Sequence, residues 1–161
     1  MNSFLALSCF FICFITTFAF VKDDTQLWSH TFKVQEKSFF VNSDKMNFTE
    51  ALDYCKKNNL QLAAIETLAE SEHLYKEMSY LGIFLLPFWS SGTKLSKSNE
   101  WIWLGLGELI TFFDWNDGEP STKDGNEFCI AINPDYTGHG FWSSKSCNSS
   151  IFSLCQSVSK N

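Results

Sequence analysis

Residues 46–66 read MNFTEALDYCKKNNLQLAAIE, and this stretch decides the fold. Asn47 and Glu50 stand at the spacing of a capping box, in which each side chain accepts a hydrogen bond from the other residue's backbone N–H. Apolar side chains then recur at the i, i+3, i+4, i+7 spacing of one helix face, at Phe48, Ala51, Leu52 and Cys55. The pattern predicts a helix that begins after Asn47, followed by a brief extended run over residues 60–65.

A second helix is predicted directly after this run. Thr67 and Glu70 stand at capping-box spacing, and Gly82 ends the helix. Its apolar face comprises Leu74, Met78 and Leu81. Residues 28–41 are short and aromatic and suggest one or two strands, and after residue 82 short aromatic runs alternate with Gly- and Ser-containing turns. Two helices followed by such a β-rich half predict an α+β domain.

Length and charge limit the functional classes. The 161 residues suffice for one domain with a substantial core, to which 17 Phe and six Trp contribute. The net charge of −6 and the absence of any Lys or Arg run argue against nucleic-acid binding, which needs a basic face. The sequence carries no G-x-S-x-G, H-E-x-x-H or phosphate-cradling motif, so we do not predict an enzyme.

Residues 1–19 are predicted to be a secretory signal peptide. Residues 4–21 are almost wholly apolar, Thr17-Phe18-Ala19 offers small residues at the cleavage-site spacing, and charged residues follow from Lys22. An uncleaved anchor is the alternative, which hydroxyl residues within the run and the lack of a stalk disfavour. We expect a secreted protein without membrane insertion, with a single domain over residues 20–161 and a core over about 28–157.

Cysteine counting agrees with export. Two cysteines fall in the predicted signal peptide, and four remain: Cys55, Cys129, Cys147 and Cys155. Four cysteines in a secreted domain imply two disulfides with three possible connectivities. A zinc site is the alternative, but no C-x-x-C pair is present and the three histidines are scattered.

Two sequons make Asn47 and Asn148 candidate N-glycosylation sites in an exported chain. Because a glycan on Asn47 would compete with its capping role, Asn148 is the preferred site.

These features together resemble the C-type lectin-like domain over nearly the whole mature chain, in its short form. The resemblance implies disulfides Cys55–Cys155 and Cys129–Cys147, and a fold of two helices, antiparallel β-sheets and long irregular loops. FWSSG at residues 88–92 matches the family's central core strand in position, whereas WIWLG at 101–105 resembles that strand's usual spelling but lies too close to the next landmark.

The resemblance also implies a ligand set for calcium and sugar. It comprises Glu119 and Ser121 of the family's E-P-N-like triplet, the second acid Glu127, and Ser143 and Ser144, which follow Trp142 where the family has W-N-D. In the family, the proline between the first two ligands is usually cis. Because serines replace an amide at two of these positions and a carboxylate at a third, a weakened calcium site is expected, with Asp117, Asp124 or Asp135 as possible substitutes. The string WND at residues 115–117 lies too far from Cys147 to be the family's own motif, so Trp115 is expected to pack under the loop and 116–118 to form a turn.

The resemblance therefore implies a secreted lectin-like protein that binds galactose- or mannose-type glycans on cell or microbial surfaces, as in innate immunity. Glu-Pro-Ser matches neither the mannose-type nor the galactose-type triplet, and Trp142 or Phe141 is a candidate to stack on a sugar. The alternative is a calcium-independent module of the same fold that binds a protein partner. A glycosidase using Glu119 and Glu127 as paired carboxylates is the one enzymatic interpretation, and nothing else in the chain supports it. Domains of this kind often depend on oligomers for avidity, and the sequence shows no coiled-coil stalk that would supply one.

Overall fold

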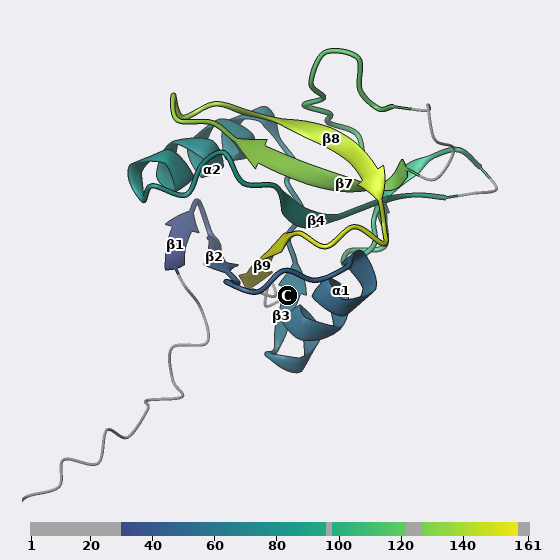
Figure 1. The fold of residues 1–161 in the computed structure, drawn as a ribbon, viewed down its shortest axis with the longest axis horizontal. Coiled ribbons are helices and arrows are strands. Elements are labelled where there is room, and N and C mark those ends of the chain that lie inside the picture. The colour runs from purple at the N-terminus through teal and green to yellow at the C-terminus, as the bar shows by residue number, and fades with distance from the viewer. Residues whose placement is uncertain (1–29, 96–97, 122–126, 158–161) are drawn as a thin grey trace, which may run out of the picture.

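The computed structural model describes residues 30–95, 98–121 and 127–157, apart from the side chain of Glu127. The elements in chain order are β1 (His30–Val34), β2 (Lys37–Val41), α1 (Phe48–Lys57), β3 (Leu60–Leu62), α2 (Leu68–Tyr80), β4 (Phe88–Lys94), β5 (Trp101–Trp103), β6 (Glu108–Leu109), β7 (Glu127–Pro134), β8 (Gly140–Ser146) and β9 (Phe152–Ser157). The predicted α+β fold with two helices is confirmed (Figure 1). Among the described residues, no helix is long and apolar enough to cross a membrane.

The first helix begins where the sequence predicts. Asn47 caps α1, its side chain accepts from Glu50 N–H at 2.9 Å, and the Glu50 carboxylate accepts from Asn47 N–H at 2.9 Å. Phe48, Ala51 and Cys55 are buried on its inner face. Local chemistry thus fixes the start of this helix.

The second predicted capping box is only half formed. The Thr67 hydroxyl accepts from Glu70 N–H at 3.2 Å, but the Glu70 carboxylate reaches past Thr67 to accept from Glu66 N–H at 2.9 Å. Glu70 is buried, and its other oxygen lies 2.7 Å from Lys37 Nζ on β2. The ion pair with a distant strand therefore displaces the local reciprocal bond, and the prediction of a complete box is wrong.

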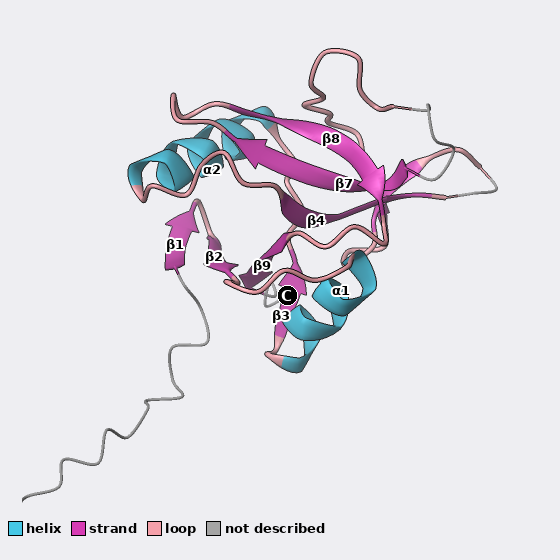
Figure 2. Ribbon diagram, in the orientation of Figure 1, coloured by secondary structure: helices cyan, strands magenta, loops and turns pink. Residues whose placement is uncertain are grey.

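The sheet runs in the order β1-β2-β9-β4-β5-β6, with β3 on β9 and with β7 pairing both β4 and β8. Its pairings are antiparallel as expected, except that of β4 with β9, which is parallel. Strand β4, which carries residues 88–92, is central and buried, whereas β5 lies towards the edge, so the assignment of FWSSG to the core strand is confirmed. Residues 110–121 form a long loop outside the named helices and strands, and Figure 2 draws such segments in pink.

Both disulfides form with the pairing that the resemblance implies. Cys55–Cys155 joins α1 to β9 and Cys129–Cys147 joins β7 to the turn after β8. Their sequence separations are 100 and 18 residues. On the chain-entropy relation, loops of these lengths correspond to about 4.7 and about 3.2 kcal/mol of stabilisation, so the outer bridge contributes more.

Two apolar clusters fill the space between these layers. The larger lies between α2, the β1–β2 hairpin and the β7–β8 hairpin, and the smaller surrounds α1, Trp89 and the disulfides. Trp89 is fully buried, and its indole N–H donates to the carbonyl of Met46 at 2.9 Å. This packing gives the irregular loops a rigid base.

Candidate functional site

The loop that carries Glu119 is attached to the edge of β8. Trp142 N–H donates to Asp114 C=O at 2.7 Å, and Asn116 N–H donates to Trp142 C=O at 2.9 Å. A parallel bridge joins Trp115 to Trp142. The loop then turns at Gly118, which has a φ of +80°, with Glu119 N–H donating to Asn116 C=O at 2.9 Å. The predicted turn over residues 116–118 is therefore confirmed, and it directs Glu119 towards the next residues of β8.

Three of the predicted ligand positions meet there. One oxygen of Glu119, Oε2, accepts hydrogen bonds from Ser121 N–H at 2.8 Å, from Ser144 N–H at 2.9 Å and from Ser144 Oγ–H at 2.6 Å. The peptide bond between Glu119 and Pro120 is cis, as the resemblance implies. Residues that are 25 apart in the chain are thus brought into direct contact.

The charge of Glu119 is compensated by its surroundings. Partial burial raises the pKa of this carboxyl, but the hydrogen bonds from Ser144 and Ser121 and the nearby charge of Lys145 together outweigh burial and lower the pKa below its ordinary value. Glu119 is therefore held as a carboxylate.

Ser143 points to a different partner. Its Oγ accepts from the Asn133 side-chain amide at 3.0 Å, and the same amide also donates to Phe141 C=O at 3.0 Å. Asn133 lies on β7, which pairs with β8. The structure therefore brings Glu119, Ser121 and Ser144 together and binds Ser143 to β7.

The remaining predicted ligands do not join this cluster among the described atoms. Asp135 lies at the tip of the β7–β8 hairpin, where its Oδ1 accepts from Thr137 and His139. Asp135 is five residues beyond Ile130, the β7 partner of Ser144, and five residues of extended chain correspond to about 17 Å. Asp124 and the side chain of Glu127 lie outside the described residues, and Asp117 is exposed on the turn.

The described residues do not fit the calcium ion that the family implies. Calcium takes six to eight oxygen ligands, and carboxylates supply most of its binding energy. Among the side chains that the structure describes, Glu119 is the single carboxylate of the cluster, and its Oε2 faces three hydrogen-bond donors. No group of three or more His, Cys, Asp or Glu side chains that could hold a metal occurs in the described parts of the chain.

Aromatic side chains surround the base of the loop. Trp142 is fully buried, so it packs in the core and does not stack on a ligand, whereas Phe141 is 44% exposed. Trp115 is half-buried and packs edge-on against Trp101 at 5.1 Å and against Trp142 at 5.9 Å, as predicted for a residue under the loop.

An exposed platform beside Trp115 was not predicted as part of the site. The Phe113 ring stacks on Trp115 with centroids 5.8 Å apart and is 41% exposed, and Leu109 is 55% exposed. A hollow of about 300 Å³ opens here, lined by Asn99, Glu100, Trp101, Leu109, Ile110, Thr111 and Phe113. The aromatic run ITFFDW could have indicated this surface. Which of its side chains are exposed, however, depends on how the loop is attached to β8.

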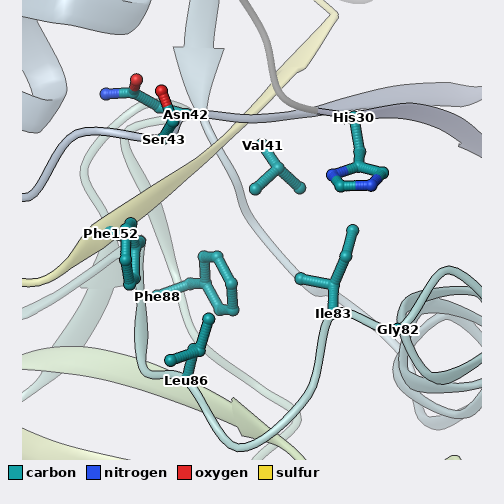
Figure 3. Close-up of a pocket in the computed structure, with 9 residues that line it drawn as sticks. All are labelled: His30, Val41, Asn42, Ser43, Gly82, Ile83, Leu86, Phe88 and Phe152. Atoms are coloured by element: carbon teal, nitrogen blue, oxygen red, sulfur yellow. The ribbon is translucent and has the colours of Figure 1, made fainter.

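A second hollow, of about 230 Å³, lies between β1, β2 and the segment after α2 (Figure 3). Val41, Ile83, Leu86 and Phe88 point into it, and His30, Asn42 and Ser43 lie at its margins. It shares no lining residue with the Glu119 cluster, and we assign it no function.

Comparisons with known proteins agree with the fold described above. The family model of the lectin C-type domain matches residues 44–157. E-selectin of Oryctolagus cuniculus is 30% identical over 146 residues, which cover 86% of this chain and 24% of the relative. E-selectin of Bos taurus is 29% identical over 127 residues, covering 77% of this chain and 25% of the relative. The chain thus spans about a quarter of the length of these relatives.

Solved structures share the fold. Human lithostathine superposes with a TM-score of 0.69 at 20% identity, covering 81% of this chain and 98% of that one. The carbohydrate-recognition domain of mouse scavenger receptor C-type lectin gives 0.67 at 21% identity, covering 83% and 97%. The calcium-free form of a Ca²⁺-dependent type II antifreeze protein gives 0.66 at 24% identity, covering 81% and 98%.

Proposed function

Because this chain belongs to the C-type lectin domain family, we propose that it is a secreted recognition protein that binds carbohydrate at the face formed by Glu119, Ser121 and the platform around Phe113. The convergence of Glu119, Ser121 and Ser144 on one another, from two distant segments, is the observation that carries the proposal. The expected ligands are galactose- or mannose-type glycans on cell or microbial surfaces, in a setting such as innate immunity.

The chemistry of this face suits a sugar ring. A pyranose presents hydroxyl groups at its edge and C–H groups on its face, so its recognition needs polar groups beside an aromatic surface. The Glu119 carboxylate supplies a polar group, and Phe113, which lies six residues earlier in the same loop and stacks on Trp115, supplies an exposed ring. Binding by hydrogen bonds and stacking involves no bond cleavage, so the proposed role is that of a binding module.

Affinity chromatography tests the proposal. The purified mature protein is passed over immobilised mannose and immobilised galactose, and we expect retention on at least one resin and elution by the free sugar. Phe113→Ala should reduce retention, whereas Phe128→Ala removes an exposed ring of similar accessibility on β7 and serves as the matched control. If a folded protein is retained on neither resin, the proposal is wrong for these two classes of sugar.

A protein partner is the second candidate, and a separate surface favours it. Tyr80, Leu85 and Tyr136 are 86%, 70% and 70% exposed around the end of α2 and the tip of the β7–β8 hairpin. Ser79 Oγ–H donates to Tyr136 C=O, and Leu85 N–H donates to Pro134 C=O, so these side chains are held at one end of the molecule. If this surface binds a partner, Leu85→Ser should abolish that binding and leave sugar retention unchanged.

A further inference from the structure

We propose that the Glu119 loop is closed by a set of serine–carboxylate hydrogen bonds in the place where relatives use calcium, so that the loop needs no metal ion to adopt its binding conformation. We call Glu119, Ser121 and Ser144 the serine latch. The inference concerns how the loop is held and does not rest on the identity of the ligand.

The latch satisfies its own polar groups. Glu119 Oε2 accepts three hydrogen bonds of 2.6–2.9 Å, two from backbone N–H groups and one from the Ser144 hydroxyl. Ser144 Oγ in turn accepts from Ser121 N–H at 2.7 Å. Ser144 is only 4% exposed, so its hydroxyl would be costly to bury without these partners. Glu119 Oε2, the Ser144 hydroxyl and the N–H groups of Ser121 and Ser144 therefore all have partners inside the protein.

The exchange of a carboxylate for serine at position 144 explains why a metal becomes dispensable. An aspartate at position 144 would place a second acceptor-only group against Glu119, and two carboxylates in contact require a cation or a shared proton. Serine removes one negative charge and supplies a hydrogen that Glu119 accepts at 2.6 Å. The substitution converts a pair that needs an ion into a pair that is complete without one.

The same cluster also opposes a cation electrostatically. The N–H groups of Ser121 and Ser144 direct the positive ends of their dipoles at Glu119 Oε2, and the backbone cannot rotate them away. A calcium ion bound to that oxygen would lie beside these positive ends and would displace the Ser144 hydroxyl.

At position 143, next to Ser144, a serine also replaces a ligand of the family. Ser143 stands where the family has an amide ligand, and its Oγ accepts from the Asn133 side chain at 3.0 Å. A side chain at this position therefore joins two strands. Both serines after Trp142 take part in internal hydrogen bonds.

Calcium titration of the full mature chain tests the inference without any sugar. We expect the wild-type melting temperature to be the same in calcium and in chelator. A variant with Ser121→Asn, Ser143→Asn and Ser144→Asp restores the family's ligand types, and it should melt about 3–10 °C higher in calcium at 10–100 times its dissociation constant than in chelator. A calcium-dependent rise in the wild type that Glu119→Gln abolishes would overturn the inference, as would a restored variant that is indifferent to calcium.

Hydrogen exchange tests the latch itself. Ser144→Ala should accelerate exchange of the Ser121 amide by about tenfold or more, because the loop loses the hydroxyl that joins its two halves. Ser146→Ala, on the same strand and outside the latch, is the control and should leave that amide unchanged. Unchanged protection of the Ser121 amide in a folded Ser144→Ala protein would show that the hydroxyl does not hold the loop. Neither measurement depends on sugar retention, so the failure of the proposed function would be recognised separately.

Discussion

The Ser71→Ala substitution should loosen the Glu119 loop from a position inside the core. Ser71 lies in the first turn of α2 and is fully buried, and its hydroxyl donates to Asp114 Oδ2 at 2.7 Å. Asp114 is the residue at which the loop meets β8, because its carbonyl accepts from Trp142 N–H. The hydroxyl therefore connects a rigid helix to the first residue of the attached segment.

The magnitude follows from the kind of hydrogen bond that is lost. A hydrogen bond to a charged acceptor contributes about 1.5–3 kcal/mol. Alanine favours the helix over serine by about 0.5 kcal/mol, which offsets part of the loss. The net decrease in the free energy of unfolding should be about 1–2.5 kcal/mol, or about 4–10 °C in melting temperature for a domain of this size.

Denaturant unfolding measures the loss of stability, and hydrogen exchange measures the loosening of the Glu119 loop. The stability loss should appear in a double-mutant cycle with Asp114→Ala as a coupling energy of about 1 kcal/mol or more. The matched control is Ser79→Ala on the same helix, whose hydroxyl donates to Tyr136 C=O at 3.0 Å near the surface. Equal effects of the two serine substitutions, or no coupling with Asp114, would refute the reasoning.

Three further predictions concern the scaffold and export. Gly140→Ala would place a Cβ 2.5 Å from the buried Tyr75 ring and should cost about 1–3 kcal/mol, which thermal denaturation will measure; an unchanged melting temperature would contradict the contact. Lys37→Met leaves the buried carboxylate of Glu70 without its cation and should cost about 3–5 kcal/mol in denaturant unfolding; a neutral effect would show that the ion pair is not needed. Asn148→Gln should abolish the mobility shift that an endoglycosidase produces in protein expressed through a secretory pathway, because this side chain is exposed; a retained shift would place the glycan elsewhere.

The sequence predicts the parts of the fold that depend on local chemistry. The helix at Asn47 begins at its predicted cap because both partners of the capping box lie within four residues of each other. Glu70 has an equally good local signal, yet its carboxylate is drawn to Lys37, more than thirty residues away. A residue that is buried beside an opposite charge follows that charge, and the sequence alone does not place the two together.

The candidate site likewise has features that the sequence predicts and features that depend on long-range contacts. The resemblance predicts that Glu119, Ser121 and Ser144 lie near one another, and they do. It does not predict their hydrogen bonds, because a ligand list counts oxygens and does not say which of them face a donor. The exposure of Phe113 was also missed, since it depends on the backbone pairing that attaches the loop to β8.

The hydrogen bonds of this site extend from α2 to the Glu119 loop. Ser71 on α2 donates to the Asp114 side chain, Trp142 donates to the Asp114 carbonyl, and Ser144, two residues further along β8, donates to Glu119. Each step joins groups of the protein itself, so the geometry of Glu119 is determined by the packing of α2 and β8. Since an ion at the loop would be supplied or withdrawn by the surrounding medium, a loop held in this way should keep its shape when calcium varies. Its affinity for a ligand should then respond to substitutions in the core, such as Ser71→Ala, more strongly than to chelation.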